Sequence, residues 1–92
     1  MTPSQTDVIQ LVNEMADPEA LYIDGYEDAI IGVADVWRDN TRRTVVVYDY
    51  EAMIVSMIDD EVTAEDAAEY IEFNISGAYV GPYQPIIVQR LK

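Results

Sequence analysis

The residues of this chain with the greatest chemical potential form an acidic run at positions 59–74, which reads DDEVTAEDAAEYIEFN. The run places seven carboxylates in sixteen residues and contains no Lys or Arg. Carboxylates at this density can hold a metal ion, act as an acid–base pair, or present a negative surface to a basic partner. The choice among these chemistries depends on the other residue types and on the elements that position the acids.

The composition excludes most enzymatic chemistry. The chain has no His and no Cys, which removes ordinary zinc sites and the nucleophile systems that pair Ser or Cys with His. The motifs DGYED and DDE offer oxygens but lack the twelve-residue calcium-loop pattern. There is no glycine-rich phosphate loop, and the only Lys is the last residue. We therefore expect a protein that is not an enzyme, with no catalytic residues, no cofactor and no metal site.

The charge balance favours a basic partner. Eighteen acids against five bases give the 92-residue chain a formal net charge of −13. Such a charge repels nucleic acids and anionic membranes, so we expect no direct binding to either. The absence of a basic N-terminal segment and of a long apolar run predicts a cytoplasmic protein that is not exported. All five bases lie in the middle of the chain or at its C-terminal end, at Arg38, Arg42, Arg43, Arg90 and Lys92.

Apolar periodicity and turn signals predict one α+β domain over residues 1–92. The expected order of elements is α-β-β-β-α-α-β, and the first strand is the weakest. The expected sheet is small and antiparallel, and consists of a central hairpin and a C-terminal strand. Three helices are expected to cover one face of this sheet.

Local signals place these elements along the chain. Thr2, Pro3 and Gln5 are typical of a helix start with a capping box. A hairpin is expected at 29–49, with the polar sequence RDNTRR as its connection. Asp49 is expected to cap a short, buried second helix. The remaining expected ranges are 21–23 for the weak strand, 63–75 for the third helix and 86–89 for the last strand.

The third helix gives the acidic run a defined surface. Glu65, Glu69 and Glu72 follow the i, i+4, i+7 row opposite the apolar stripe. Their Cα atoms rise by about 5–6 Å per step, roughly the phosphate spacing along a nucleic-acid strand. A solvated helix face, with an acidic first turn that complements the helix dipole, is the alternative interpretation. The acids that extend this surface around the preceding turn are Asp59, Asp60 and Glu61.

Aromatic residues supply candidate contacts for a partner. The chain has seven Tyr, one Trp and one Phe, and Tyr and Trp are enriched at interfaces because they combine apolar area with a polar tip. Tyr79 and Tyr83, in the sequence GAYVGPYQP, are expected to be exposed. Trp37, next to RDNTRR, is a candidate anchor. The alternative is that the Tyr residues line the margin of the core and that Trp37 covers a sheet edge.

Three blocks carry a resemblance to a known family. LYIDGYEDAIIGV, VVVYDYEAMI and EDAAEYIEFNISGAYVG resemble a family of small proteins that are encoded by bacteriophages and by bacterial genomes carrying prophage. The resemblance spans residues 21–81. It implies a phage context but no activity, because the family has no established activity. Two segments depart from the family: the hairpin connection is longer and basic here, and GPYQP replaces a loop of the Gly-Glu-Gly-Thr-Pro type.

The sequence therefore predicts a phage-type acidic protein that acts by binding. The leading hypothesis is an inhibitor, or nucleic-acid mimic, directed at a basic host nucleic-acid-binding or defence protein of the anti-CRISPR or anti-restriction type. The alternative is a virion-associated or accessory structural protein, and acidity as an adaptation to a salt-rich host is compatible with either. A homodimer remains open. The predicted partner-binding residues are Asp59, Asp60, Glu61, Glu65, Glu69, Glu72, Tyr79, Tyr83 and Trp37.

Overall fold

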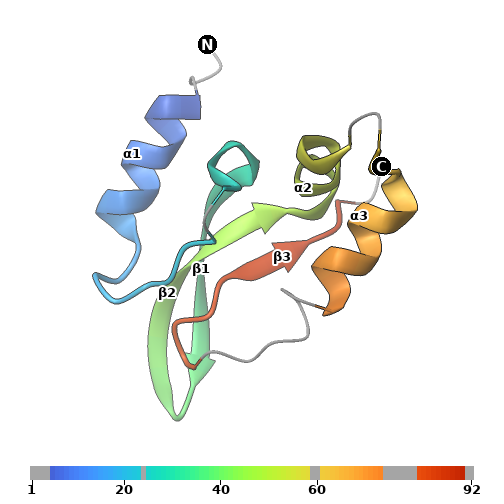
Figure 1. Ribbon diagram of the computed structural model, residues 1–92. Helices are drawn as coiled ribbons and strands as arrows, with labels where there is room; N and C mark the ends of the chain where they lie inside the picture. Colours follow the sequence, from blue (N-terminus) through green and yellow to red (C-terminus); the bar gives the residue numbers. More distant parts are fainter. Residues whose placement is uncertain (1–4, 24, 59–60, 74–80, 91–92) are drawn as a thin grey trace.

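A computed structural model of the chain describes residues 5–23, 25–58, 61–73 and 81–90 and shows an α+β fold (Figure 1). Within these ranges a three-stranded sheet is combined with three α-helices and a short 3-10 helix, which confirms the predicted class. The elements are α1 (Gln5–Met15), η1 (Glu27–Ala29), β1 (Ile30–Arg38), β2 (Thr41–Asp49), α2 (Tyr50–Met57), α3 (Ala64–Ile71) and β3 (Ile86–Val88).

The hairpin is longer and its turn tighter than the sequence suggested. β1 and β2 pair up to Arg38 and Thr41, so only Asp39 and Asn40 connect them. Both residues have positive φ, 55° and 60°, as required by the two-residue turn that matches the twist of paired strands. Asp and Asn tolerate this conformation better than other side chains. The predicted six-residue connection RDNTRR is therefore wrong, because four of its residues belong to the ladder.

The last strand pairs with the hairpin in the opposite sense to the prediction. β3 lies beside β2, with Val47 opposite Ile86 and Asp49 opposite Val88, and the two strands are parallel. The sheet is therefore mixed, with the order β1-β2-β3, and the predicted antiparallel sheet is corrected at this pair. The physical reason is the crossover between β2 and β3, which contains α2 and α3 and lets the chain re-enter the sheet in the same direction.

The core is centred on β2. Residues 45–49 are all buried, because β2 is the middle strand and is covered on both faces. Val46 and Tyr48 share one face, and all three helices contribute to the cluster around them through Val12, Met53 and Ile71. The Tyr48 hydroxyl also accepts a hydrogen bond of 2.8 Å from the backbone N–H of Ile23.

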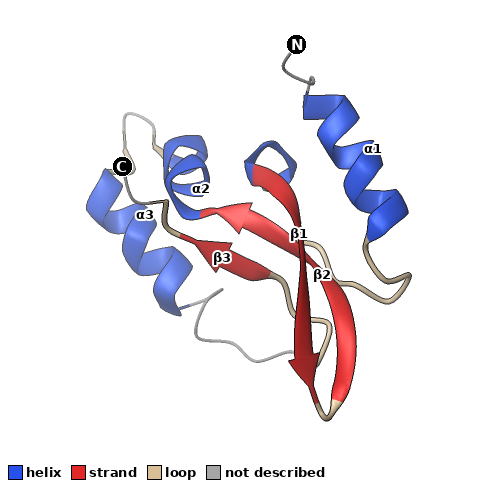
Figure 2. Cartoon of the chain, turned by 180° about the vertical axis from the view of Figure 1, so that it is seen from behind, coloured by secondary structure: helices blue, strands red, loops and turns tan. Residues whose placement is uncertain are grey.

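The helices pack at different places around this core. α1 packs against β1, and α3 packs against α2, which directly follows β2. Figure 2 shows α1 at one flank of the molecule and α2 with α3 at the other, while the hairpin turn lies at the far end from α2. Within the described ranges no helix is long and apolar enough to cross a bilayer.

Two N-terminal predictions have different outcomes. Segment 21–23 is not a strand, because its backbone bonds reach separate partners rather than one neighbouring strand: Leu21 donates to Tyr83 O and Ile23 to the Tyr48 hydroxyl. The predicted helix start at Thr2 and Pro3 lies outside the described residues. Gln5 Nε2 donates to the carbonyls of Glu27 and Ile30, at 2.9 and 3.1 Å, and so ties α1 to the start of β1.

Candidate functional site

Helix α3 presents the acidic row that the sequence predicted. The Thr63 hydroxyl accepts a hydrogen bond of 3.2 Å from the Asp66 N–H and so caps the helix. Ala67 and Ile71 are buried and fix the inner face. The residues of the acidic row, all exposed, are Glu65, Glu69 and Glu72.

The position of these acids along α3 opposes helix stability at one end. Glu65 lies in the first turn, where a negative charge complements the helix dipole. Glu69 lies in the last turn and Glu72 is the C-terminal cap residue, where the dipole favours a cation, but α3 has no basic residue in its last turn. Like charges three or four residues apart also repel each other. Folding therefore does not explain Glu69 and Glu72.

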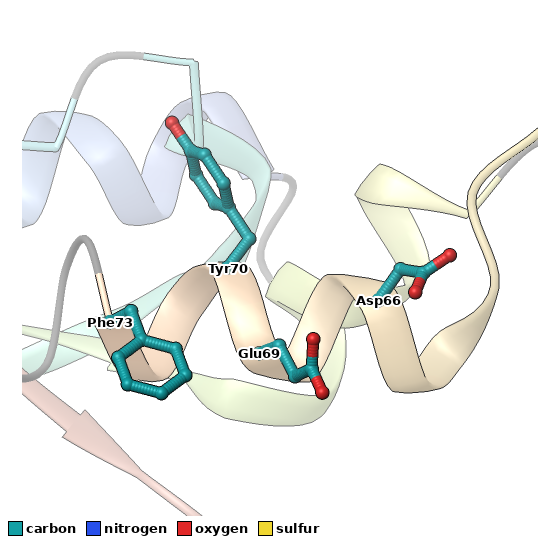
Figure 3. Close-up of a pocket in the computed structure, with 4 residues that line it drawn as sticks. All are labelled: Asp66, Glu69, Tyr70 and Phe73. Carbon is teal, nitrogen blue, oxygen red and sulfur yellow. The ribbon is translucent and has the colours of Figure 1, made fainter.

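Aromatic side chains accompany the acids on α3. Asp66, Glu69, Tyr70 and Phe73 line a shallow, open hollow of about 290 Å³. Figure 3 shows the side chains of Glu69 and Phe73 on the same side of α3, and that of Tyr70 pointing away from them. Phe73 is 78% exposed and Tyr70 is 49% exposed. The sequence analysis did not select either residue. The available signal was that Phe73 lies four residues after Glu69, on the polar side of the helix.

Tyr70 also reaches the segment that precedes η1. Burial raises the pKa of the Tyr26 hydroxyl, and the neighbouring Tyr70 raises it further. Tyr26 packs against the core cluster. One end of the α3 surface is thus held close to the core of the domain.

The described cations are occupied elsewhere. Arg42 pairs with Asp35, and Arg90 pairs with Asp49 at 2.6 Å. The guanidinium of Arg43 lies 4.6 Å from the centre of the Tyr83 ring, which is a cation–π distance. Arg38 donates to the carbonyls of residues 82 and 84 at 2.9 and 2.8 Å. All four described arginines thus make contacts within the protein, and none of these contacts is with the acidic row of α3.

The structure brings together only part of the predicted site. Asp59, Asp60 and Tyr79 lie outside the described residues, and Glu61 is exposed just before α3. Tyr83 is half-buried beneath Arg43 rather than beside the acids. Trp37 is 74% exposed but belongs to the hairpin. The described acidic surface, hereafter the α3 surface, therefore consists of Glu65, Asp66, Glu69, Tyr70, Glu72 and Phe73.

The α3 surface is an exposed surface rather than an enclosed cavity. The hollow is open, and the described residues contain no group of three or more acids arranged to hold a metal ion. No protein-family model, curated protein or solved structure matches the chain. The chemistry of the α3 surface is therefore the basis for a functional proposal.

Proposed function

We propose that the protein is a phage-type acidic inhibitor that binds a basic surface of a host nucleic-acid-binding or defence protein and excludes nucleic acid from it. The observation that carries this proposal is the combination on α3 of an exposed acidic row with a 78% exposed Phe73. The acids supply attraction to Lys and Arg side chains. Phe73 supplies apolar area that a partner removes from water.

The two components act on different parts of the binding reaction. The net charge of −13 speeds the approach of a basic partner and makes association weaker as salt increases. Burial of an exposed aromatic ring lengthens the life of the complex, because aromatic residues in desolvated positions dominate binding energy. The proposal thus predicts a salt-dependent association rate and a dissociation rate that depends on Phe73.

A displacement assay tests the inhibitor function. Fluorescent duplex DNA is bound to purified basic effectors, including a CRISPR effector complex and a restriction enzyme, at low salt, and the protein is added. Release of DNA by the wild-type protein, lost in the triple variant Glu65→Gln, Glu69→Gln, Glu72→Gln, is the expected result. Failure to release DNA from every effector, or equal release by the triple variant, contradicts the proposal.

Adaptation to salt is separated from partner binding by thermal unfolding. If the acids serve only to hold water and ions in a salt-rich cell, the protein needs molar KCl to fold. A protein whose acids serve a partner is folded at about 0.15 M salt, where charges are screened beyond about 8 Å. We expect the second result.

A further inference from the structure

The charge of the protein is distributed very unevenly. The hairpin, residues 30–49, contains three acids and three bases and has no net charge. The remaining residues contain fifteen acids and two bases and carry the whole charge of −13. The six balanced residues of the hairpin are Asp35, Arg38, Asp39, Arg42, Arg43 and Asp49.

The neutral hairpin also carries an open sheet edge. β1 is an outer strand in the order β1-β2-β3. Its pairing with β2 is regular from Gly32 to Arg38, after an irregularity between Ile30 and Gly32. The Gln5 side-chain amide donates a hydrogen bond to the carbonyl of Ile30. Beyond that point, within the described part of the chain, no further backbone bond covers the outer edge of β1.

β1 has only partial protection as an outer strand, because the irregularity between Ile30 and Gly32 affects only its first residues. Proteins blunt such edges with Pro, with Lys or with other outward charges, and β1 contains neither Pro nor Lys. The charge of Asp35 is compensated by Arg42, and its carboxylate also accepts from the Thr44 hydroxyl at 2.7 Å. β1 also exposes large apolar side chains, with Ile31 41% and Trp37 74% exposed.

The side of β2 that faces away from β1 is covered by other parts of the chain. β3 does not reach Thr44, and Asp17 bonds the backbone of β2 there instead. The Asp17 carboxylate accepts from the Thr44 N–H, and the Asp17 N–H donates to the Thr44 carbonyl, both at 2.9 Å. From Val47 onward β3 provides the pairing. The chain therefore covers this side of β2 with dedicated contacts and leaves β1 open.

We propose that the outer edge of β1 pairs with β1 of a second copy of this chain, antiparallel about a two-fold axis, to form a continuous six-stranded sheet. The distribution of charge favours a second copy as the partner of this edge. Two copies with a charge of −13 each repel each other, and they approach at least cost through their neutral hairpins. A basic partner is instead attracted to the acidic helices. A two-fold pairing also places each exposed Trp37 against the other copy, so apolar area is buried on both sides.

Analytical ultracentrifugation of the full chain between about 1 and 500 µM, in low and in moderate salt, tests the dimer. We expect the mass to rise from 10.4 kDa toward twice that value as concentration increases. We also expect association to strengthen with salt, because salt screens the repulsion between copies. A mass that remains monomeric at all concentrations in both salts, or association that weakens with salt, overturns the proposal.

A matched pair of variants tests the surface. Ile31→Lys with Trp37→Lys adds charge to the β1 edge, while Leu11→Lys with Met15→Lys adds the same charge to exposed apolar positions of α1. We expect at least a tenfold weaker association in the first variant than in the second. Equal association constants would place any dimer elsewhere and overturn the proposal.

Hydrogen exchange of the wild-type protein gives a readout that needs no variant. Pairing between copies protects β1 amides, so their exchange should slow as concentration rises, while exchange in α1 should not change. Concentration-independent exchange in β1 contradicts the proposal. The salt dependence of the dimer has the opposite sign to that of binding to a basic partner, so the two proposals can fail separately.

Discussion

The hairpin and helix α3 use charge in opposite ways. In the hairpin, Arg42 has an acidic partner, Arg38 bonds two carbonyl groups and Arg43 lies against an aromatic ring. On α3 the acids are exposed and no base lies in the last turn of the helix. The four described arginines all make structural contacts, whereas the described contacts include none for the carboxylates of Glu65, Glu69 and Glu72. Charged groups that make structural contacts and the exposed acids of α3 thus belong to different parts of the chain.

The largest expected effect comes from removing a structural cation. Arg38→Met loses both bonds to the carbonyls of residues 82 and 84. Since bonds from a charged donor contribute about 1.5–3 kcal/mol, we expect a loss of about 2–3 kcal/mol in the free energy of unfolding, measured with urea. Arg42→Met is the control, and its loss should be smaller because its ion pair is exposed. Equal losses in the free energy of unfolding would contradict the proposed role of Arg38.

Removal of the two helix caps, Asp49 and Thr63, should have the next largest effects on stability. Asp49 is buried, accepts from the Glu51 N–H at 3.1 Å and pairs with Arg90, as the sequence predicted for a cap. Asp49→Ala should lower the free energy of unfolding by about 1–2 kcal/mol. Thr63→Ala, at the exposed cap of α3, should cost less. Thermal or urea unfolding of both variants checks this order, and the reverse order would contradict it.

Substitution of the α3 acids should change the free energy of unfolding in the opposite direction. Glu69→Gln with Glu72→Gln removes mutual repulsion and an unfavourable interaction with the helix dipole, so we expect stabilisation of about 0.5–1 kcal/mol. Glu65→Gln is the matched control, and it should be neutral or slightly destabilising because Glu65 lies in the first turn. Destabilisation by the double variant would mean that these two acids do support the fold.

The smallest expected effect is a pH dependence in the hairpin. The Thr44 hydroxyl, and then Arg42, lower the pKa of Asp35. A carboxyl whose folded pKa is below its unfolded value stabilises the fold above the unfolded pKa, about 4, and loses that contribution as pH falls through the folded pKa. The difference in urea midpoint between wild type and Asp35→Asn should therefore be present at pH 6 and shrink below about pH 4. A difference that is constant down to pH 2.5 would contradict this role.

The sequence predicted the elements that depend on local signals. The cap at Asp49, the cap at Thr63 and the acidic row of α3 each follow from residues within one or two helical turns, and the structure contains all three. The direction of β3 did not follow from such signals, because parallel or antiparallel pairing depends on the path of the whole crossover. The hairpin turn was missed for a related reason: Asp39 and Asn40 adopt positive φ without the glycine that usually marks such a turn.

Contacts of the candidate site were predictable only in part. The acids of α3 follow from helical periodicity, but the exposure of Phe73 depends on which neighbours cover it. Tyr83 is half-buried because Arg43, forty residues earlier in the chain, lies over its ring. A contact between residues so far apart in the chain leaves no pattern that can be recognised in a single sequence.

The most direct measurement compares the affinity of variants with equal net charge for one basic probe. Fluorescence anisotropy of a labelled ten-arginine peptide at low salt is measured with wild type, with Glu65→Gln, Glu69→Gln, Glu72→Gln, and with Glu14→Gln, Glu19→Gln, Asp28→Asn. Both triple variants lose three negative charges from exposed positions, but only the first changes α3. We predict that the α3 variant binds at least tenfold more weakly than the control variant. Equal affinities of the two variants would show that only total charge matters and would contradict a partner-binding site on α3.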